Sequence, residues 1–418
     1  MLSTIKRSLP LQLLTAAILA WFFATIMPAV ANITEPVTEQ AWYQLILLGK
    51  TTYIGLLKMV IGLVVMLSLM QGITNIGSTL KLKTLGVSTL IFYSLTSIIA
   101  ISLGLGAALL MPEWQPLVEP VTIADHIRFI EQDTITGSSI TAKLLAMALV
   151  NPFSALVNGN LLAIVLFSLL FSVSLLLSLP PKHVVFDVIA GLNKGLNKLV
   201  QGIIRLAPIA VFAIVFEFTV RGNTGLFGQL ALFALLVFVL TLIHGLIVLP
   251  TLAKIFTGIK FSTLFKAISA PLAMAFATSS STATLPLSMQ AAEKELGISQ
   301  STSSFVLPLG AVMNMDGTAL FEGVAAIFLA QLFGIDLSTT GIVMIFIMAM
   351  VSSVGAPGMP SGSMSGMQLV MLAAGIPLEG IAILLIIERP LDTFRTAVNV
   401  EGDLVAALVV DKWQQNKS

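Results

Sequence analysis

Residues 388–403 read ERPLDTFRTAVNVEGD and interrupt an apolar C-terminal run. An α-helix turns by about 100° per residue, so this stretch would place several polar side chains on one face. They are the side chains of Glu388, Asp392, Arg395, Thr396, Asn399 and Asp403. Ionisable groups at membrane depth cost at least ~2.5–3.5 kcal/mol each unless they are paired, hydrated or bound to a ligand. The stretch therefore indicates a polar binding site inside the membrane, or else a buried Asp392–Arg395 ion pair that locks helices together.

The composition of the whole chain favours a membrane protein. Over 418 residues the hydrophobic fraction is 57% and the charged fraction 10%, and the mean hydropathy is +1.01. A soluble domain cannot expose so much apolar surface, so we expect an all-α polytopic membrane protein. A net charge of +1 argues against a nucleic-acid partner. The absence of cysteine excludes thiolate metal sites, and we interpret His244, which lies within a span, as a structural or gating residue rather than a ligand.

Apolar runs predict the first six membrane spans, and positive charge orients them. The spans are expected at roughly 10–31, 48–73, 86–111, 142–179, 194–220 and 227–256. The first run lacks a clear cleavage site, so we expect a retained span rather than a signal peptide. Lysine and arginine fall on alternate connections, which the positive-inside rule assigns to the cytoplasm together with both termini.

Two later segments cannot form continuous spanning helices. Residues 275–288 read AFATSSSTATLPLS, and residues 351–366 read VSSVGAPGMPSGSMSG. Unpaired backbone groups in lipid cost several kcal/mol, so such breaks occur where they line a cavity enclosed by protein or filled with water. Two interrupted segments in corresponding places point to a transporter site formed by re-entrant hairpins, one entering from each side. Small-residue helix packing is the structural alternative, although it favours spaced small residues over clusters with proline.

Between these segments, residues 307–323 read LPLGAVMNMDGTALFEG. Gly317 permits a local break, and an unwound turn with Asn314, Asp316 and bare carbonyls would offer hard oxygen ligands. Such ligands suit Na⁺, Mg²⁺ or Ca²⁺ rather than soft metals. The third span adds further oxygens from Tyr93, Thr96 and Ser97, although hydroxyls of this kind also bond to their own helix.

These motifs resemble the glutamate transporter family, the dicarboxylate/amino acid:cation symporters. The resemblance rests on NMDGT at 314–318, TLP at 284–286, LDxxRTxxNVxGD at 391–403, NPFSALVNGN at 151–160 and RLAPIAVFAIV at 205–215. It implies eight transmembrane helices, two re-entrant helical hairpins, inverted repeats, an elevator mechanism, and a homotrimer in the cell (inner) membrane. It further implies a scaffold formed by residues 1–80 and 116–225, a transport domain formed by 81–115 and 226–411, and a cytoplasmic tail at 412–418.

The resemblance also assigns roles in binding the substrate. Arg395 matches the arginine that holds the side-chain carboxylate of an acidic amino acid, and Asp392 matches the aspartate that holds its α-amino group. The remaining substrate contacts implied are Ser281, Met315, Thr318, Ala356, Gly358, Thr396 and Asn399. The family's second arginine is replaced here by Ser279 and Thr393, which leaves Arg389 as the available substitute, and Met359-Pro360 stand in the second hairpin where small residues are usual.

The co-transported cations are assigned in the same way. One Na⁺ site matches Gly310, Asn314, Asn399 and Asp403. A second matches Tyr93, Thr96, Ser97, Asn314 and Asp316, and a third matches Met315, Ser352 and Ser353. Glu322 matches the proton carrier of proton-coupled members, and burial would disfavour its charged form. The alternative is a structural glutamate that is permanently protonated or that is paired with Arg389 or Arg395.

We therefore expect a secondary active symporter, not an enzyme, which takes up L-glutamate or L-aspartate with Na⁺ and a proton and needs no resident cofactor. A proton-only glutamate/aspartate symporter and a C4-dicarboxylate symporter are the nearest alternatives. An ion channel would show repeated filter loops, which the sequence lacks. An intramembrane hydrolase using Ser280 or Ser281 would need a nearby base, and no histidine motif lies in the last third.

Overall fold

The computed structural model is helical throughout the part that it describes, as the composition predicts. The described residues are 9–30, 40–74, 85–117, 145–146, 148–158, 160–180, 183–220, 225–355 and 362–416. The helices in chain order are α2 (Leu9–Val30), α3 (Ala41–Thr74), α5 (Val87–Leu110), α7 (Pro152–Asn158), α8 (Leu161–Ser178), α9 (Val184–Ile204), α10 (Ala207–Val220), α11 (Leu226–Ile243), η4 (His244–Val248), α12 (Leu249–Thr257), α13 (Phe261–Thr278), α14 (Ser281–Lys294), α15 (Gln300–Met313), α16 (Asp316–Leu332), α17 (Thr339–Gly355), α18 (Ser363–Ala373) and α19 (Gly380–Gln415).

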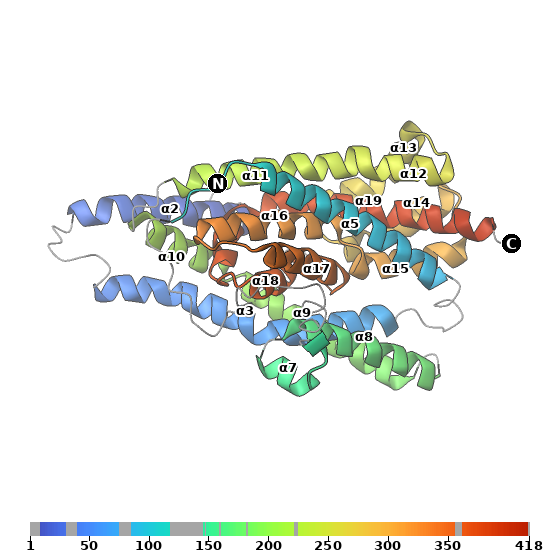
Figure 1. The fold of residues 1–418 in the computed structure, drawn as a ribbon, viewed down its shortest axis with the longest axis horizontal. Coiled ribbons are helices and arrows are strands. Elements are labelled where there is room, and N and C mark those ends of the chain that lie inside the picture. Colours follow the sequence, from blue (N-terminus) through green and yellow to red (C-terminus); the bar gives the residue numbers. More distant parts are fainter. Residues whose placement is uncertain are drawn as a thin grey trace.

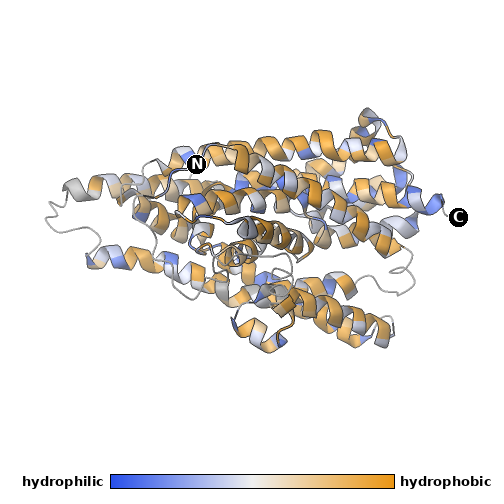
Figure 2. Cartoon of the chain, in the orientation of Figure 1, coloured by the Kyte–Doolittle hydropathy of each residue, from blue (hydrophilic) through white to orange (hydrophobic). Residues whose placement is uncertain are grey.

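Within the described residues, five helical segments are long and apolar enough to cross a membrane. They are Ala41–Thr74, Val87–Leu110, Leu226–Thr257, Phe261–Thr278 and Gln300–Leu332, and a sixth is obtained if α9 and α10, which meet at a bend of 41°, form one broken span. Apolar residues run along most of each helix (Figure 2), including the outward-facing sides. On α2, for example, Leu14, Ile18 and Phe22 are all more than half exposed. A helix that is apolar on its outer face requires a lipid environment.

The fifth predicted span differs from the observed helices. It was expected at 194–220, but α9 already begins at Val184, where His183 caps its first turn, and the chain bends before α10 begins at Ala207. Pro208 explains the bend, because proline has no N–H to donate to the preceding turn and its ring collides with the carbonyl four residues back.

Helix α19 lies inside the molecule and organises the packing (Figure 1). It packs against α5, against α10 and against α11 through α16, and makes smaller contacts with α2, η4 and α18. A second group comprises α3, which packs against α8, α9 and α10, together with α2, which packs against α10. In Figure 1, α3, α8 and α9 form the lower edge, α11 to α13 form the upper edge, and α16 and α19 lie between them.

Two helix pairs occupy the positions of the predicted hairpins. Helices α13 and α14 pack against each other and are joined only by Ser279 and Ser280. Ser279 has φ 50°, a left-handed conformation that ends α13, and the Ser280 hydroxyl accepts the Ala283 N–H at 3.2 Å to cap α14. Helices α17 and α18 likewise pack together. The tip of this second pair, including Ala356 and Gly358, lies outside the described residues.

The membrane segment Gln300–Leu332 is divided at its centre. Helix α15 ends at Met313, and Asn314 and Met315 leave the helical conformation with φ −131° and −121°. Helix α16 resumes at Asp316, so the break comes before Gly317 rather than at it. The residues of α16 are almost all fully buried. Bare backbone groups at this depth lie inside protein, where they are available to a ligand.

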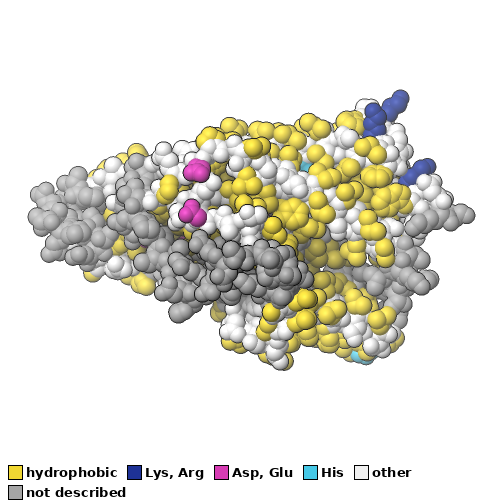
Figure 3. All heavy atoms as spheres, in the orientation of Figure 1, with side chains coloured by type: hydrophobic (Ala, Val, Ile, Leu, Met, Phe, Trp, Pro, Cys, Tyr) yellow, Lys and Arg dark blue, Asp and Glu magenta, His cyan; other side chains and the backbone are white. Residues whose placement is uncertain are grey.

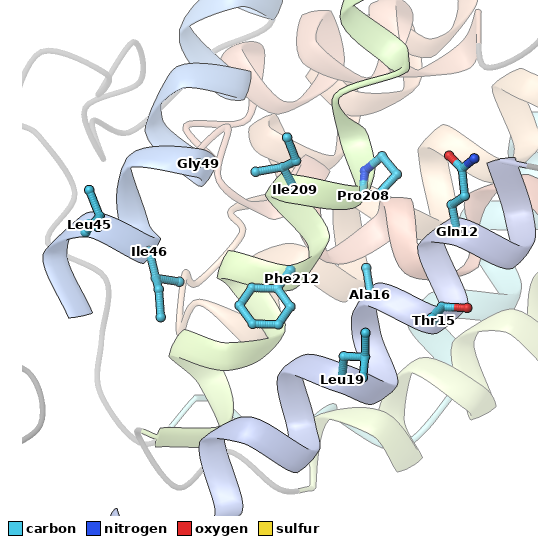
Figure 4. Close-up of a pocket in the computed structure, with 10 residues that line it drawn as sticks. All are labelled: Gln12, Thr15, Ala16, Leu19, Leu45, Ile46, Gly49, Pro208, Ile209 and Phe212. Carbon is cyan, nitrogen blue, oxygen red and sulfur yellow. The ribbon is translucent and has the colours of Figure 1, made fainter. Parts of the chain in front are cut away.

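An apolar groove of about 530 Å³ lies where α2, α3 and α10 meet. Figure 4 shows Leu19, Leu45, Ile46, Ile209 and Phe212 along it, with Gln12 and Thr15 at one side. The groove is lined by residues of α2, α3 and α10, of which α2 and α10 also contact α19.

Candidate binding site

The polar face of α19 surrounds a fully buried arginine. The Arg395 NH2 group donates to Glu388 Oε1 at 2.9 Å, to Ser363 Oγ at 3.1 Å and to Asp392 Oδ1 at 3.2 Å. The guanidinium carbon lies 4.0 Å from the centre of the Phe321 ring, which adds a cation–π contact. By contrast, Arg395 Nε and NH1 are buried without a hydrogen-bond partner. The site therefore presents unused, desolvated donors of positive charge, which is the chemistry that recognises a carboxylate.

Asp392 provides negative charge beside this arginine. Its Oδ2 accepts from Arg389 NH1 at 3.3 Å while its Oδ1 faces Arg395, so the carboxylate bridges the two guanidinium groups. Arg389 thus lies where the sequence suggested a substitute for a missing second arginine. Thr396 is buried on the same helix one residue beyond Arg395. A ligand with groups of both signs would find complementary partners here.

The break between α15 and α16 is attached to α19 by two asparagines. Asn399 Oδ1 accepts the Gly317 N–H at 2.8 Å, and its Nδ2 lies 3.4 Å from Thr318 Oγ1. Asn314 Nδ2 donates to Asp403 Oδ1 at 2.9 Å. A Cβ at Gly317 would lie 2.8 Å from the Arg395 carbonyl oxygen, so only glycine allows the two backbones to approach this closely.

Oxygen donors from three separate parts of the chain meet around Asp316 and Asp403. Ser97 Oγ of α5 donates to Asp316 Oδ1 at 2.7 Å. A Cβ at Gly310 would collide with the Asp403 carboxylate and the Tyr93 hydroxyl, so Gly310 lies against both. The Tyr93 hydroxyl donates to the Val306 carbonyl at 2.9 Å. Thr96, however, donates to the Tyr93 carbonyl of its own helix at 3.1 Å. Carboxylate, hydroxyl and amide oxygens in a dry enclosure are ligands for a hard cation.

The structure also places His244, which the sequence indicates to be a structural or gating residue, next to a predicted cation ligand. It opens the π-helix η4, a widened turn of the α11–α12 segment, and is completely buried. Its Nε2 lies 3.3 Å from Asp316 Oδ2, so the histidine contacts a predicted cation ligand. Short π-helices often lie at functional sites. The link joins positions 72 residues apart, and no local pattern in the sequence signals it.

Glu322 is buried where α16 meets α17. Ser352 Oγ donates to its Oε1 at 2.8 Å, whereas its Oε2 has no hydrogen-bond partner. Ser353 donates instead to the Met350 carbonyl at 2.9 Å, within its own helix. Among the described residues the Glu322 carboxylate bonds to Ser352, whereas Arg389 and Arg395 bond to Asp392 and Glu388, so these hydrogen bonds do not pair Glu322 with either arginine. A permanently protonated structural glutamate stays the alternative to a proton carrier.

A cavity of about 1260 Å³ lies between α9, α3 and the turn joining α13 to α14. Ser280 and Thr282 face it from that turn, and Lys194 and Lys198 face it from α9. Ser281, the first residue of α14, is buried beside this lining, and Met315 is buried at the helix break. The cavity thus lies between the first helix pair, α15 and the α3–α9 layer, and Thr282 is exposed to it, whereas Ser279 and Ser280 at the turn are buried.

The chain is similar to known membrane transporters over most of its length. The model of the sodium:dicarboxylate symporter family matches residues 9–413. The proton/glutamate-aspartate symporter of Escherichia coli is 32% identical over 87% of this chain and 84% of its own. The proton/sodium-glutamate symport protein of Bacillus caldotenax is 30% identical over 87% and 86%. The neutral amino acid transporter B(0) of Bos taurus is 33% identical over 84% and 70%.

Proposed function

Because the chain belongs to the sodium:dicarboxylate symporter family, we propose that it is a membrane symporter that takes up L-glutamate or L-aspartate with Na⁺ and a proton. The single observation that carries the substrate class is the buried pair of unused donors, Nε and NH1, on Arg395. Like its family, the chain is classed with transporters rather than enzymes.

The two signs of charge in the site select the substrate. Arg395 offers a fixed fork to a second carboxylate, and Asp392 offers a partner to an ammonium group. A C4-dicarboxylate such as succinate has no ammonium, and a neutral amino acid has no second carboxylate. Either would leave a buried group poorly paired, which is costly in a closed site.

The test of this assignment is uptake into proteoliposomes containing the purified protein. Radiolabelled L-aspartate and L-glutamate are compared with succinate and alanine under imposed Na⁺, H⁺ or combined gradients. We expect concentrative uptake of the acidic amino acids alone. Equal rates for succinate and aspartate would overturn the assignment, and full uptake driven by a pH gradient without Na⁺ would favour a proton-only symporter.

For the cations we propose the three sites of the sequence analysis. The Asn314–Asp403 hydrogen bond and the close approach of Gly310 to Asp403 support the first, and the Ser97–Asp316 hydrogen bond supports the second. Met315, Ser352 and Ser353 are buried next to the helix break and α17, in keeping with the third. No resident cofactor is part of the proposal, because the ions travel with the substrate.

Replacing Asp403 with asparagine is expected to weaken the dependence on Na⁺ more than the recognition of substrate. The change keeps the shape but removes the negative charge, and hydrogen bonds and contacts to charged groups contribute about 1.5–3 kcal/mol. The Na⁺ concentration for half-maximal uptake should rise by about tenfold or more, with the substrate KM rising mainly at low Na⁺. Asp411→Asn is the matched control on the same helix, since Asp411 accepts from Ser299 at 2.6 Å. An equal shift in both variants would contradict the assignment.

We further propose the family's architecture for this chain. Eight spans would be α2, α3, α5, α8, α9 with α10, α11 with α12, α15 with α16, and α19, and the pairs α13–α14 and α17–α18 would be re-entrant. A transport domain of residues 81–115 and 226–411 would slide as an elevator against a scaffold of residues 1–80 and 116–225 within a homotrimer. The extensive packing of α19 against α11 through α16 supports this grouping, and its contacts with α10 and α2 would belong to the interface between the two domains.

The orientation follows from charge. Figure 3 shows basic side chains at the end of the molecule where α12 and α13 meet, and acidic side chains towards the other end. Lys254, Lys260 and Lys266 are the exposed lysines of that segment. The positive-inside rule supports placing this end, and both termini, on the cytoplasmic side of the inner membrane.

A single cysteine at Thr282 tests this orientation. The chain has no native cysteine, so the labelling background is zero. Thr282 is exposed to the cavity near Lys194, and we expect Thr282→Cys to react with a membrane-impermeant maleimide in inside-out vesicles but not in right-side-out vesicles. The control is Thr284→Cys, which lies two residues on and is fully buried, and which should react far more slowly. Labelling of Thr282→Cys only from outside would reverse the proposed topology.

A further inference from the structure

Glu388 is a second carboxylate in the binding site, and the substrate assignment gives it no role. It is 1% exposed, and its Oε1 makes the shortest hydrogen bond that the Arg395 guanidinium forms, at 2.9 Å. The same oxygen accepts from Ser363 Oγ at 3.2 Å, and Ser363 in turn accepts from Arg395 at 3.1 Å. Glu388, Ser363 and Arg395 thus form a closed triangle between α19 and α18.

The arrangement of the guanidinium nitrogens explains why this triangle affects the substrate. A guanidinium binds a carboxylate bidentately along an edge, through NH2 with Nε or through NH2 with NH1. Both edges include NH2, and all the hydrogen bonds of Arg395 to Glu388, Ser363 and Asp392 use this nitrogen. Nε and NH1 are buried with no partner. A substrate carboxylate that binds bidentately must therefore displace one of the groups that already accept a hydrogen bond from NH2.

Two acids bond to Arg395, and the contacts of each indicate that Glu388, rather than Asp392, loses its hydrogen bond when the substrate binds. Asp392 keeps its contact with Arg389 at 3.3 Å if it loses Arg395, and it has a role toward the substrate's ammonium group. Glu388 holds Arg395 most closely and contacts Ser363 of the second helix pair. We propose that Glu388 is the internal counter-carboxylate of Arg395, which pairs with the guanidinium in the empty carrier and releases it to the substrate's side-chain carboxylate.

The consequence for transport, which rests on the proposed function, concerns the return of the empty carrier. With Glu388, the two arginines Arg389 and Arg395 form ion pairs with two carboxylates, so the charges of these four side chains are balanced. Without it, the empty site carries an uncompensated buried charge across the membrane, whereas the loaded site is balanced by the substrate. An unpaired charge at depth costs at least ~2.5–3.5 kcal/mol. Loss of Glu388 should therefore slow the return of the empty carrier across the membrane and leave the movement of the substrate-loaded carrier largely unchanged.

Two transport modes separate these steps. Exchange of external labelled aspartate for internal aspartate uses only the loaded carrier, whereas net uptake into aspartate-free vesicles also requires the empty carrier to return. Glu388→Gln keeps the size and hydrogen-bonding capacity of the side chain and removes its charge. We expect exchange within about threefold of wild type and net uptake at least about tenfold lower, in line with the cost of an unpaired charge.

The controls make the outcome specific. Ser363→Ala keeps both charges, so its ratio of net uptake to exchange should stay near that of wild type. Glu388→Asp keeps the charge but lengthens the contact, so its ratio should fall between those of wild type and Glu388→Gln. If Glu388→Gln does not yield folded protein, Glu388→Asp carries the test, and an unchanged ratio would overturn the proposal.

Failure of this inference is distinguishable from failure of the proposed function. Wild-type protein with no flux of aspartate or glutamate in either mode would refute the symporter assignment. Wild-type flux with the same ratio in Glu388→Gln would refute only the counter-carboxylate. Loss of both modes in Glu388→Gln that elutes like wild type on gel filtration would also refute it, because Glu388 would then serve the loaded site.

Discussion

Arg395→Cys is expected to abolish uptake of L-glutamate and L-aspartate, lowering kcat/KM by at least about a hundredfold. Truncating one partner of a buried, hydrogen-bonded charge pair costs about 2–5 kcal/mol, and here the substrate's carboxylate loses its binding partner. The variant also leaves Glu388 and Asp392 buried without this arginine, which disfavours any further negative charge. Neutral amino acids bring no second carboxylate and should no longer be discriminated against.

The measurement is uptake of labelled aspartate, glutamate, serine and alanine by wild type and variant in parallel. Arg389→Cys is the matched control, because it removes the same group from the same helix at a position that is partly exposed and, among the described residues, forms its ion pair with Asp392. We expect this control to retain a preference for acidic substrates. Aspartate uptake by Arg395→Cys within about tenfold of wild type, which corresponds to 1.4 kcal/mol, would show that another group binds the side-chain carboxylate.

Glu322→Gln is expected to separate substrate movement from proton movement. Wild-type uptake should acidify the vesicle lumen, whereas the variant should exchange substrate without acidification. The glutamine keeps the size of the side chain and can still accept from Ser352, so the helix contact survives while the dissociable proton is lost. The free Oε2 in a fully buried setting is what a proton-carrying carboxyl requires.

A pH-sensitive dye trapped in the vesicles reports this result during aspartate uptake. Glu401→Gln is the matched control, since Glu401 is also buried with an unpartnered Oε1 yet points toward Gly245 of the π-helix. Unchanged acidification in Glu322→Gln, at the same ratio of protons to substrate, would exclude Glu322 as the carrier. Acidification lost only in Glu401→Gln would assign the proton to Glu401.

The sequence predicted those parts of the site that one helix or one motif contains. The face of α19 could be derived from the 100° turn between residues, and the break near Asn314 from glycine beside polar residues. The contacts between side chains of different helices could not be derived from the sequence. His244 reaches Asp316 across 72 positions, and Ser363 reaches Arg395 across 32, through packing alone. Phe321 looked like any apolar core residue, although its ring covers the guanidinium.

Glu388 illustrates the limit most clearly. The helical angle placed Glu388 on the polar face of α19. The angular position of a residue on one helix does not show which groups lie opposite it, so it could not distinguish a ligand of the substrate from a partner of Arg395. The resemblance assigned the arginine's external partner and said nothing of its internal one. Only the position of α18 beside α19 brings Ser363 to both groups and defines the triangle.

The order in which the site's elements are synthesised imposes a demand on biogenesis. Asp316 precedes α19, which supplies Arg395, Asn399 and Asp403, in the chain and is translated before it. Chains are translated at about 5–20 residues per second, so Asp316 is made several seconds before that helix is complete. Ser97 and His244, which contact Asp316, both lie earlier in the chain, so these two contacts require no part of α19.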